Sequence, residues 1–240
     1  MIVNKNPPAP ALLQTPVLLV ILSDILTGEG GEKMSRTFEF TKEKTALLIV
    51  DLQNDFCRQG APLLVEEALE TIPANKKLLT FARENNMPVI FTKFITGKKA
   101  SWLWNWSPEI ESSHCCMRGY ERYYPDIDKK EQCADIIEEL KPILPDDYVI
   151  EKYHYSSFRN TALIDILRSE GADAVIVTGT VTQICVEDTA HDGFAEGVKV
   201  IVASDCVSTW DPSQQKAVLE NVANKYGIVM TSDEIIRKLK

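Results

Sequence analysis

A short, unbroken apolar run at residues 174–177, A-V-I-V, constrains the fold of this chain more than any other stretch. Three of its four residues are β-branched, and a run without polar alternation is typical of a strand buried on both faces. The residues T-G-T at 178–180 end the run, and helical spacing of apolar side chains begins at Ile184. A strand of this kind followed by a helix predicts a parallel sheet that helices cover on both sides.

The same alternation of strand and helix extends from residue 44 to the C-terminus. The pattern predicts further strands at 45–50, 88–92, 148–152, 198–202 and 228–230, and helices over roughly 66–85, 161–169, 212–226 and from 232 onward. Residues 95–130 lack periodicity and hold three of the four tryptophans, so we expect a long irregular insertion there.

Six strands connected by helices predict a three-layer α/β/α, doubly wound sheet of six mainly parallel strands in the order 3-2-1-4-5-6. Strands 1 and 4 are then neighbours where the order reverses, which is where such sheets bind ligands. Asp51 ends strand 1, Cys185 follows strand 4, and Lys152 ends strand 3, about 10 Å away at ~4.8 Å per strand. We therefore expect these three polar side chains to converge at one edge of the sheet.

Cys185 is expected in the first turn of the helix that follows the buried strand. Unpaired N–H groups and the helix dipole there favour the thiolate and lower the pKa of the thiol, and the same N–H groups can receive an oxyanion. The alternative is an inert cysteine that fills a gap between helix and sheet. Taken singly, Asp51 is equally consistent with a turn or capping residue, and Lys152 with a surface lysine at the end of a strand.

Four sequence motifs give the chain a resemblance to a known family. They are D-L-Q-N-D-F at 51–56, V-I-E-K-Y-H-Y-S-S-F at 149–158, V-T-G-T-V-T-Q-I-C-V-E-D-T-A at 177–190 and A-S-D-C-V-S at 203–208. From about residue 44 to its end the chain resembles the isochorismatase-like cysteine hydrolases, which include nicotinamidases, N-carbamoylsarcosine amidases and ureidoacrylate amidohydrolases. The resemblance implies a catalytic triad of Asp51, Lys152 and Cys185. It also implies a cis peptide between Thr180 and Val181, and an oxyanion hole formed by the N–H groups of Val181 and Cys185.

The implied function is a cysteine-dependent hydrolase that cleaves a C–N bond of a small amide, carbamoyl or ureido compound through a thioester and releases ammonia. One alternative is an isochorismatase-type enzyme that acts on a vinyl ether, although true isochorismatases typically lack the cysteine. Another is a non-catalytic binding protein on the same fold, because fold does not determine function.

Aromatic residues provide most of the candidate substrate contacts. Those contacts are Gln53, Phe56, Trp102, Trp104, Tyr155 and Phe158. The tryptophans at 102, 104 and 106 alternate, so they would share one face of an extended lid or, equally, of a subunit interface. Arg118, Arg122 or Lys98 could pair with a substrate carboxylate, and Gln53 and Asp55 are also expected to support the Asp51 loop.

The sequence gives no indication of a metal or cofactor site. Nicotinamidases carry a D-x-H…H metal site after the second strand, whereas this chain has only His114, His154 and His191. We therefore expect no metal and no cofactor, and nicotinamide is a poor candidate substrate. The adjacent pair Cys115-Cys116 is expected to be a packing feature.

The charge and cysteine content of the chain indicate which classes of binding partner and which cellular compartment to expect. The net charge of −9 argues against nucleic acid and anionic membranes. The six cysteines include no C-x-x-C pair, which favours a reduced, cytoplasmic protein. The resemblance implies a homodimer or homotetramer that binds a small-molecule substrate.

The first 35 residues are expected to be a poorly ordered extension, followed by a single hydrolase domain at 36–240. The apolar run at 16–22 is far shorter than the ~20 residues that span a bilayer. The residues G-E-G-G-E-K at 28–33 have purine-rich codons, as a ribosome-binding site would, so translation is hypothesised to start at Met34. Residues 1–33 in the N-terminal sequence of the native protein would contradict this.

Overall fold

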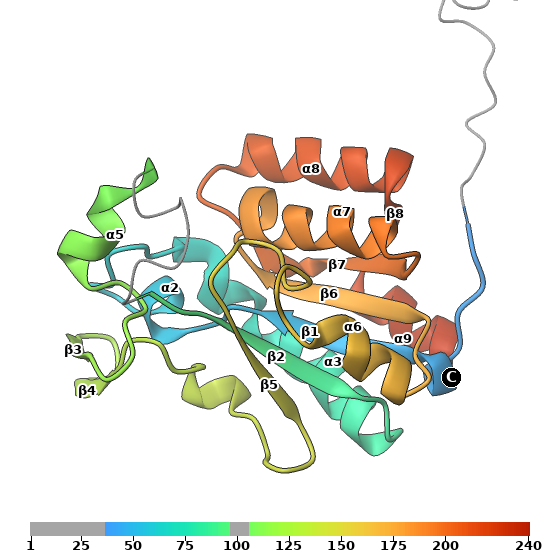
Figure 1. Cartoon of the computed structure of the whole chain (residues 1–240), viewed down its shortest axis with the longest axis horizontal. Coiled ribbons are helices and arrows are strands. Elements are labelled where there is room, and N and C mark those ends of the chain that lie inside the picture. The colour runs from blue at the N-terminus through green and yellow to red at the C-terminus, as the bar shows by residue number, and fades with distance from the viewer. Residues whose placement is uncertain (1–36, 97–105) are drawn as a thin grey trace, which may run out of the picture. The chain divides into compact units, whose positions relative to one another are not determined.

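The computed structural model describes residues 37–96 and 106–240, and at its centre is a six-stranded, all-parallel sheet (Figure 1). The strands lie in the order β5-β2-β1-β6-β7-β8. Their bounds are β1 Thr45–Val50, β2 Val89–Phe94, β5 Tyr148–Lys152, β6 Ala174–Thr180, β7 Lys199–Ser208 and β8 Gly227–Met230. Numbered by their sequence among these six, the order is 3-2-1-4-5-6, so the predicted fold and strand order are confirmed.

Both faces of the sheet are buried, because the central strands β1 and β6 are mostly apolar and every one of their residues is buried. In β1, Leu47 and Ile49 belong to one hydrophobic cluster, whereas Ala46, Leu48 and Val50 belong to another. Helices α3 and α9 supply the first cluster, and α6, α7 and α8 supply the second. Figure 1 shows α7 and α8 stacked on the same side of the sheet. The result is the three-layer arrangement that the unbroken apolar runs predict.

The helices follow the predicted segments closely, with short turns added at several ends. Their bounds are η1 Lys42–Lys44, α2 Asn54–Cys57, η2 Glu66–Thr71, α3 Ile72–Glu84, α5 Pro108–Ser113, η3 Glu138–Leu140, α6 Leu163–Ser169, η4 Thr182–Val186, α7 Glu187–Ala195, α8 Pro212–Lys225 and α9 Ser232–Leu239. The predicted helix at 66–85 is divided into the 3₁₀ segment η2 and the α-helix α3.

Capping interactions fix where the last two helices begin. The Asp211 side chain accepts a hydrogen bond from the N–H of Ser213, and Pro212 occupies the first turn of α8. Thr231 and Glu234 form a reciprocal capping box at the start of α9.

The expectation of an irregular insertion at 95–130 was wrong in part. Within it lie α5 and the strand β3 (Glu121–Tyr124), which pairs antiparallel with β4 (Lys129–Gln132). The sequences E-R-Y-Y and K-K-E-Q have no apolar run, and most of their side chains are exposed or partly exposed. A hairpin that covers little core has no hydrophobic pattern by which the sequence could reveal it.

Several predictions lie outside the described residues. They concern Trp102, Trp104, Lys98 and the extension at 1–35, and the domain boundary near residue 36 stays a prediction. Within the described ranges, no helix is long and apolar enough to cross a membrane.

Candidate active site

Three strands bring the predicted catalytic side chains to one edge of the sheet. Asp51 directly follows β1, and Lys152 is the last residue of β5, where it pairs with Phe94 of β2. Cys185 lies in η4, directly after β6. Because all six strands are parallel, these carboxyl ends meet at the same edge.

Asp51 and Lys152 form an ion pair that solvent does not reach. The Lys152 Nζ lies 2.6 Å from Asp51 Oδ2, and both side chains are fully buried. The same ammonium donates to the carbonyl oxygens of Tyr155 at 2.7 Å and His154 at 3.2 Å. A buried charge persists where its counter-charge and its hydrogen bonds are both supplied, as they are here.

The Cys185 thiol joins this pair. It lies within hydrogen-bonding reach of both the Asp51 carboxylate and the Lys152 ammonium. Burial alone would lower the pKa of Lys152, but the negative charge of Asp51 and the hydrogen bond with it raise that pKa above its ordinary value. Sulfur, carboxylate and ammonium thus form one buried cluster.

The expectation of a lowered Cys185 pKa was wrong for the protein without substrate. Burial raises the pKa of this thiol to about 12, although the positive charge of Lys152 acts in the opposite direction. Removing a sulfur from water disfavours its anion more than the nearby ammonium favours it. The resting side chain is therefore a neutral thiol, which makes a nearby base necessary for any attack by sulfur.

Thr92 orients the Asp51 carboxylate. Its hydroxyl donates to Asp51 Oδ1 at 2.7 Å and accepts from the Asp51 N–H at 3.3 Å. Asp51 has a positive φ of 50°, a conformation in which a residue other than glycine is strained. Thr92 is not among the predicted site residues, although its place at the end of the predicted strand 88–92 is a usable signal.

The turn that carries Cys185 depends on Gly179. Its φ is +102°, and a Cβ there would lie 2.0 Å from the Val50 carbonyl oxygen. Only glycine lets β6 approach the end of β1, one residue before Asp51. The peptide bond between Thr180 and Val181 is cis.

The spacing of the sequence predicts Cys185 in the first turn of an ordinary α-helix. The structure differs from this prediction. η4 is a π-helical turn, in which the N–H of Val186 donates to the Val181 carbonyl five residues back. The end of β7 braces this turn, because the Thr182 hydroxyl donates to Ser208 O at 2.9 Å. π-Helical turns of this kind occur frequently at functional sites. Val181, the other expected oxyanion donor, directly precedes the turn.

Gln53 acts as a clamp on the main chain. Its amide donates to Phe94 O at 3.0 Å and Ala134 O at 2.9 Å, and accepts from Phe94 N at 2.7 Å. The side chain is fully buried. These contacts favour the role of supporting the Asp51 loop, which the sequence also suggests, over a contact with substrate.

The aromatic residues divide into two groups. Phe56 and Tyr155 flank Phe94, each with its ring centroid 6.5 Å from that of Phe94, and Phe94 lies 5.5 Å from Lys152 Nζ. Phe158 packs instead against Gly193 in the core beneath α7. The first group is therefore close to the catalytic cluster, and Phe94 is a neighbour that the sequence did not single out. Trp106 is 75% exposed.

The two described arginines that were considered for a substrate carboxylate already have acidic partners. Arg122 Nε donates to Asp55 Oδ1 at 2.9 Å, and Arg118 pairs with Glu151. Arg122 therefore braces the α2 segment.

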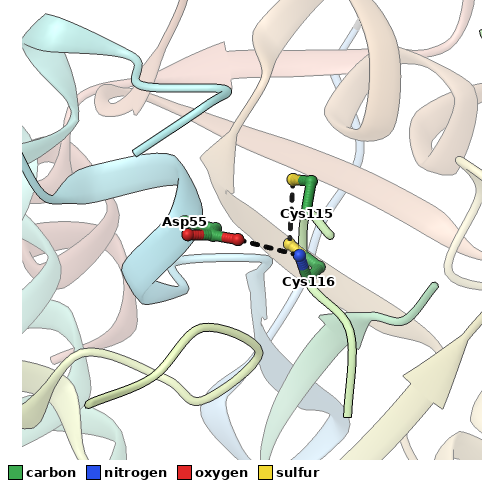
Figure 2. Close-up of side chains that lie close together, drawn as sticks. All are labelled: Asp55, Cys115 and Cys116. Carbon is green, nitrogen blue, oxygen red and sulfur yellow. Dashed lines mark hydrogen bonds between the residues drawn. The ribbon is translucent and has the colours of Figure 1, made fainter. Parts of the chain in front are cut away.

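Potential metal ligands come together in one group within the described part of the chain: Asp55, Cys115 and Cys116 (Figure 2). The three histidines are separate from it and from one another. His114 stacks on Tyr120, His154 contacts Asn160, and His191 contacts Glu187.

Comparisons with known proteins show which family the chain resembles in sequence and fold. The sequence profile of the Isochorismatase domain matches residues 45–234. Over 202 residues the chain is 33% identical to a protein of Pantoea ananatis named ureidoacrylate amidohydrolase RutB, which covers 79% of this chain and 80% of the relative.

Two solved structures share both sequence and fold with the chain. A cysteine hydrolase from Pseudomonas syringae pv. phaseolicola has a TM-score of 0.76 and 28% identity, over 87% of this chain and 98% of that one. An N-carbamoylsarcosine amidase from Thermoplasma acidophilum has a TM-score of 0.64 and 29% identity, over 79% of this chain and 97% of that one.

Proposed function

This chain belongs to the isochorismatase-like hydrolase family, and from that premise we propose that it is a cysteine-dependent amidohydrolase. Its substrate is a small amide, carbamoyl or ureido compound, and it breaks a C–N bond through a thioester on Cys185. The observation that carries the proposal is the buried cluster in which the Cys185 thiol meets both Asp51 and Lys152.

Acylation begins with a neutral thiol. As the sulfur attacks the carbonyl carbon, the S–H proton passes to the Asp51 carboxylate and the carbonyl electron pair moves to oxygen. The Lys152 ammonium stabilises the negative charge during this step, and the N–H groups of Val181 and Cys185 are the proposed donors to the oxyanion. Removal of one such donor typically lowers the rate by about 10²–10³.

Collapse of the tetrahedral species breaks the C–N bond. Asp51, now protonated, gives its proton to the departing nitrogen, and the acyl group remains on sulfur as a thioester. Water then attacks the thioester while Asp51 takes one of its protons. The C–S bond breaks, the thiol regains its proton, and an acid or carbamate leaves.

The names of two relatives support a carbamoyl or ureido compound as the substrate. These names specify ureidoacrylate and N-carbamoylsarcosine, each of which carries a terminal carbamoyl nitrogen. The aromatic rings of Phe56, Phe94 and Tyr155 beside the cluster suit a small, flat carbamoyl or ureido group.

The test is ammonia release from a panel that contains ureidoacrylate, N-carbamoylsarcosine and simple amides, together with pyruvate release from isochorismate. We expect turnover of at least one carbamoyl or ureido compound, and its loss to background in Cys185→Ala. Rapid denaturation during turnover followed by mass spectrometry should find the acyl adduct on Cys185.

The matched control is Cys57→Ala, which removes another fully buried thiol that lies outside the catalytic cluster. This variant should keep its activity. Turnover of isochorismate that survives Cys185→Ala would favour the vinyl-ether alternative. No thiol-dependent turnover on the whole panel would leave a non-catalytic binding protein.

A further inference from the structure

A second group of reactive side chains lies a few residues from Asp51. Asp55 comes from α2, and Cys115 and Cys116 directly follow the His114 that ends α5. Figure 2 shows the carboxylate directed toward the two adjacent cysteines. One ligand atom from each residue lies within 4.8 Å of the others, and all three residues are fully buried. The proposed reaction uses none of them.

The spacing of the two sulfurs matches that of ligands on a tetrahedral ion. Cys115 Sγ and Cys116 Sγ are 3.7 Å apart. Two thiolates bound to one Zn²⁺ at about 2.3 Å with a tetrahedral angle would lie about 3.8 Å apart. The pair therefore needs almost no movement to chelate a single ion.

From this spacing we infer that Asp55, Cys115 and Cys116 form a binding site for one thiophilic divalent cation such as Zn²⁺. The ligands are the two sulfurs and one Asp55 oxygen. Soft thiolates together with a carboxylate select zinc-like ions over magnesium or calcium. Binding breaks two S–H bonds and releases two protons to solvent, and no electron transfer is involved.

The surroundings of Asp55 supply what a ligating carboxylate needs. Oδ1 accepts from Arg122 Nε at 2.9 Å and from the Tyr124 hydroxyl at 2.8 Å, while Oδ2 accepts from the Cys116 N–H at 2.9 Å. These bonds fix the carboxylate, and each carboxylate oxygen has two lone pairs, so Oδ2 can bind an ion while it accepts from the Cys116 N–H. Two thiolates and a carboxylate carry three negative charges, which the ion and the Arg122 guanidinium together cancel.

The fourth position has a nearby candidate in Cys133. Its thiol hydrogen-bonds with Asp55, and its sulfur lies 3.3 Å from Met117 O. The fourth ligand of the ion is then a water or this sulfur, and in the second case a third S–H bond breaks and a third proton is released to solvent. The Arg122 side chain, which pairs with Asp55, is partly exposed.

An ion at this position would link α2, which carries Asp55, to the turn that carries Cys115 and Cys116. Thr96 N–H donates to Cys116 O at 3.1 Å, and Ile95 N–H donates to Lys152 O at 2.9 Å, so the cysteine turn is linked to the strand that carries the ammonium. Bound metal should raise the stability of the fold by mass action.

The experiment uses the full chain, reduced and freed of metal by a chelator. Titration with Zn²⁺ against a chromophoric chelator should give one ion per chain, and the thermal midpoint should rise as the site fills. Cd²⁺ should produce a thiolate-to-metal charge-transfer band in the ultraviolet.

Cysteine variants test whether the ion binds at Cys115 and Cys116. Cys115→Ser and Cys116→Ser should each weaken binding by more than about 10-fold and abolish the band. Cys57→Ala and Cys185→Ser, which remove buried thiols outside the group, should leave the affinity and the band unchanged. If both cluster variants keep the band, or if Cys185→Ser loses it, the inference is wrong.

A measurement on the wild type does not depend on how the variants fold. The cadmium-113 chemical shift reports the number of sulfur ligands, and we expect a value for two or three sulfurs. A shift typical of oxygen and nitrogen ligands would overturn the site. So would the absence of saturable binding at one ion per chain, or a thiol count that shows Cys115 and Cys116 joined in a disulfide.

Discussion

Lys152 illustrates how one side chain serves both stability and chemistry. Its ammonium has Asp51 Oδ2 at 2.6 Å and two carbonyl oxygens as partners, and water reaches neither charge. Such a pair contributes little net stability, but removal of one partner leaves the other charge buried and uncompensated. In the proposed reaction, the same charge stabilises the anions that form when Cys185 attacks the substrate. Stability and activity should therefore respond differently to changes at this pair.

A double substitution separates the two roles. Lys152→Met should lower the free energy of unfolding by about 3–5 kcal/mol, because the Asp51 carboxylate loses its counter-charge. Adding Asp51→Asn should restore much of this stability, whereas activity should remain absent in both variants. Urea unfolding and ammonia release measure the two effects. A double variant that is less stable than Lys152→Met would show that the pair is not the source of the loss.

At the scale of elements, the close approach of β6 to β1 sets the geometry of the site. Val50 and Gly179 are paired in register, and the catalytic turn starts directly after them. Any side chain at Gly179 would push the two strand ends apart. Asp51 and Cys185 would then separate, because each follows one of these ends.

Gly179→Ala should therefore impair both folding and catalysis. Gly197→Ala is the matched control, since Gly197 also has a positive φ of 78° but open space where a Cβ would lie. Alanine at 179 should destabilise the fold by about 1–3 kcal/mol more than alanine at 197, because it adds a steric clash to the backbone strain. A shift of the reacting groups by about 1 Å can lower the rate by about 10², so the 179 variant should lose activity and the 197 variant should keep it. Equal effects in urea unfolding and turnover assays would contradict this account.

The sequence predicts those helices and strands whose buried side chains produce a hydrophobic pattern along the chain. The apolar runs of β1 and β6 predict the sheet. The hairpin β3–β4 escapes because its side chains cover little core. The π-helical turn at Cys185 escapes for a different reason: its hydrogen-bond register is set by contacts with Ser208 and Gln215, which lie far away in the sequence.

The candidate active site likewise has features that the sequence predicts and features that it does not. The positions of Asp51, Lys152 and Cys185 follow from strand ends and strand order, so the sequence brings them together. Their protonation does not follow, because the pKa of Cys185 depends on burial that only the folded structure specifies. The pairing of Cys115 and Cys116 with Asp55 is hidden in the same way, because a helix and a distant turn supply the ligands.

On the scale of the whole molecule, all six cysteines are reduced and buried. Burial raises the pKa of Cys185 and Cys133 to about 12, and it raises the pKa of Cys57, Cys116 and Cys206 as well. The folded protein thus holds several thiol protons that the unfolded chain would lose near its ordinary thiol pKa of about 8.5.

This difference predicts a loss of stability at alkaline pH. Groups whose pKa is raised by folding stabilise fully below the unfolded pKa, and the contribution disappears as the pH rises toward the folded value. The free energy of unfolding should fall from about pH 9 upward, by at most about 1.4 kcal/mol per pH unit for each fully buried thiol. Urea midpoints between about pH 8 and 10, with reductant present, measure the slope. Cys57→Ala should make the slope shallower, and midpoints that stay constant up to pH 10 would refute the prediction.

The strand that carries Lys152 lies at the margin of the sheet, with β2 as its single neighbour. The edge strands of a sheet open more readily than its central strands. A brief detachment of β5 would therefore move the Lys152 ammonium away from the Asp51 carboxylate while the other strands stay paired. The stability of this edge strand then limits the temperature range of activity. On heating, activity would be lost at a lower temperature than the one at which the whole domain unfolds.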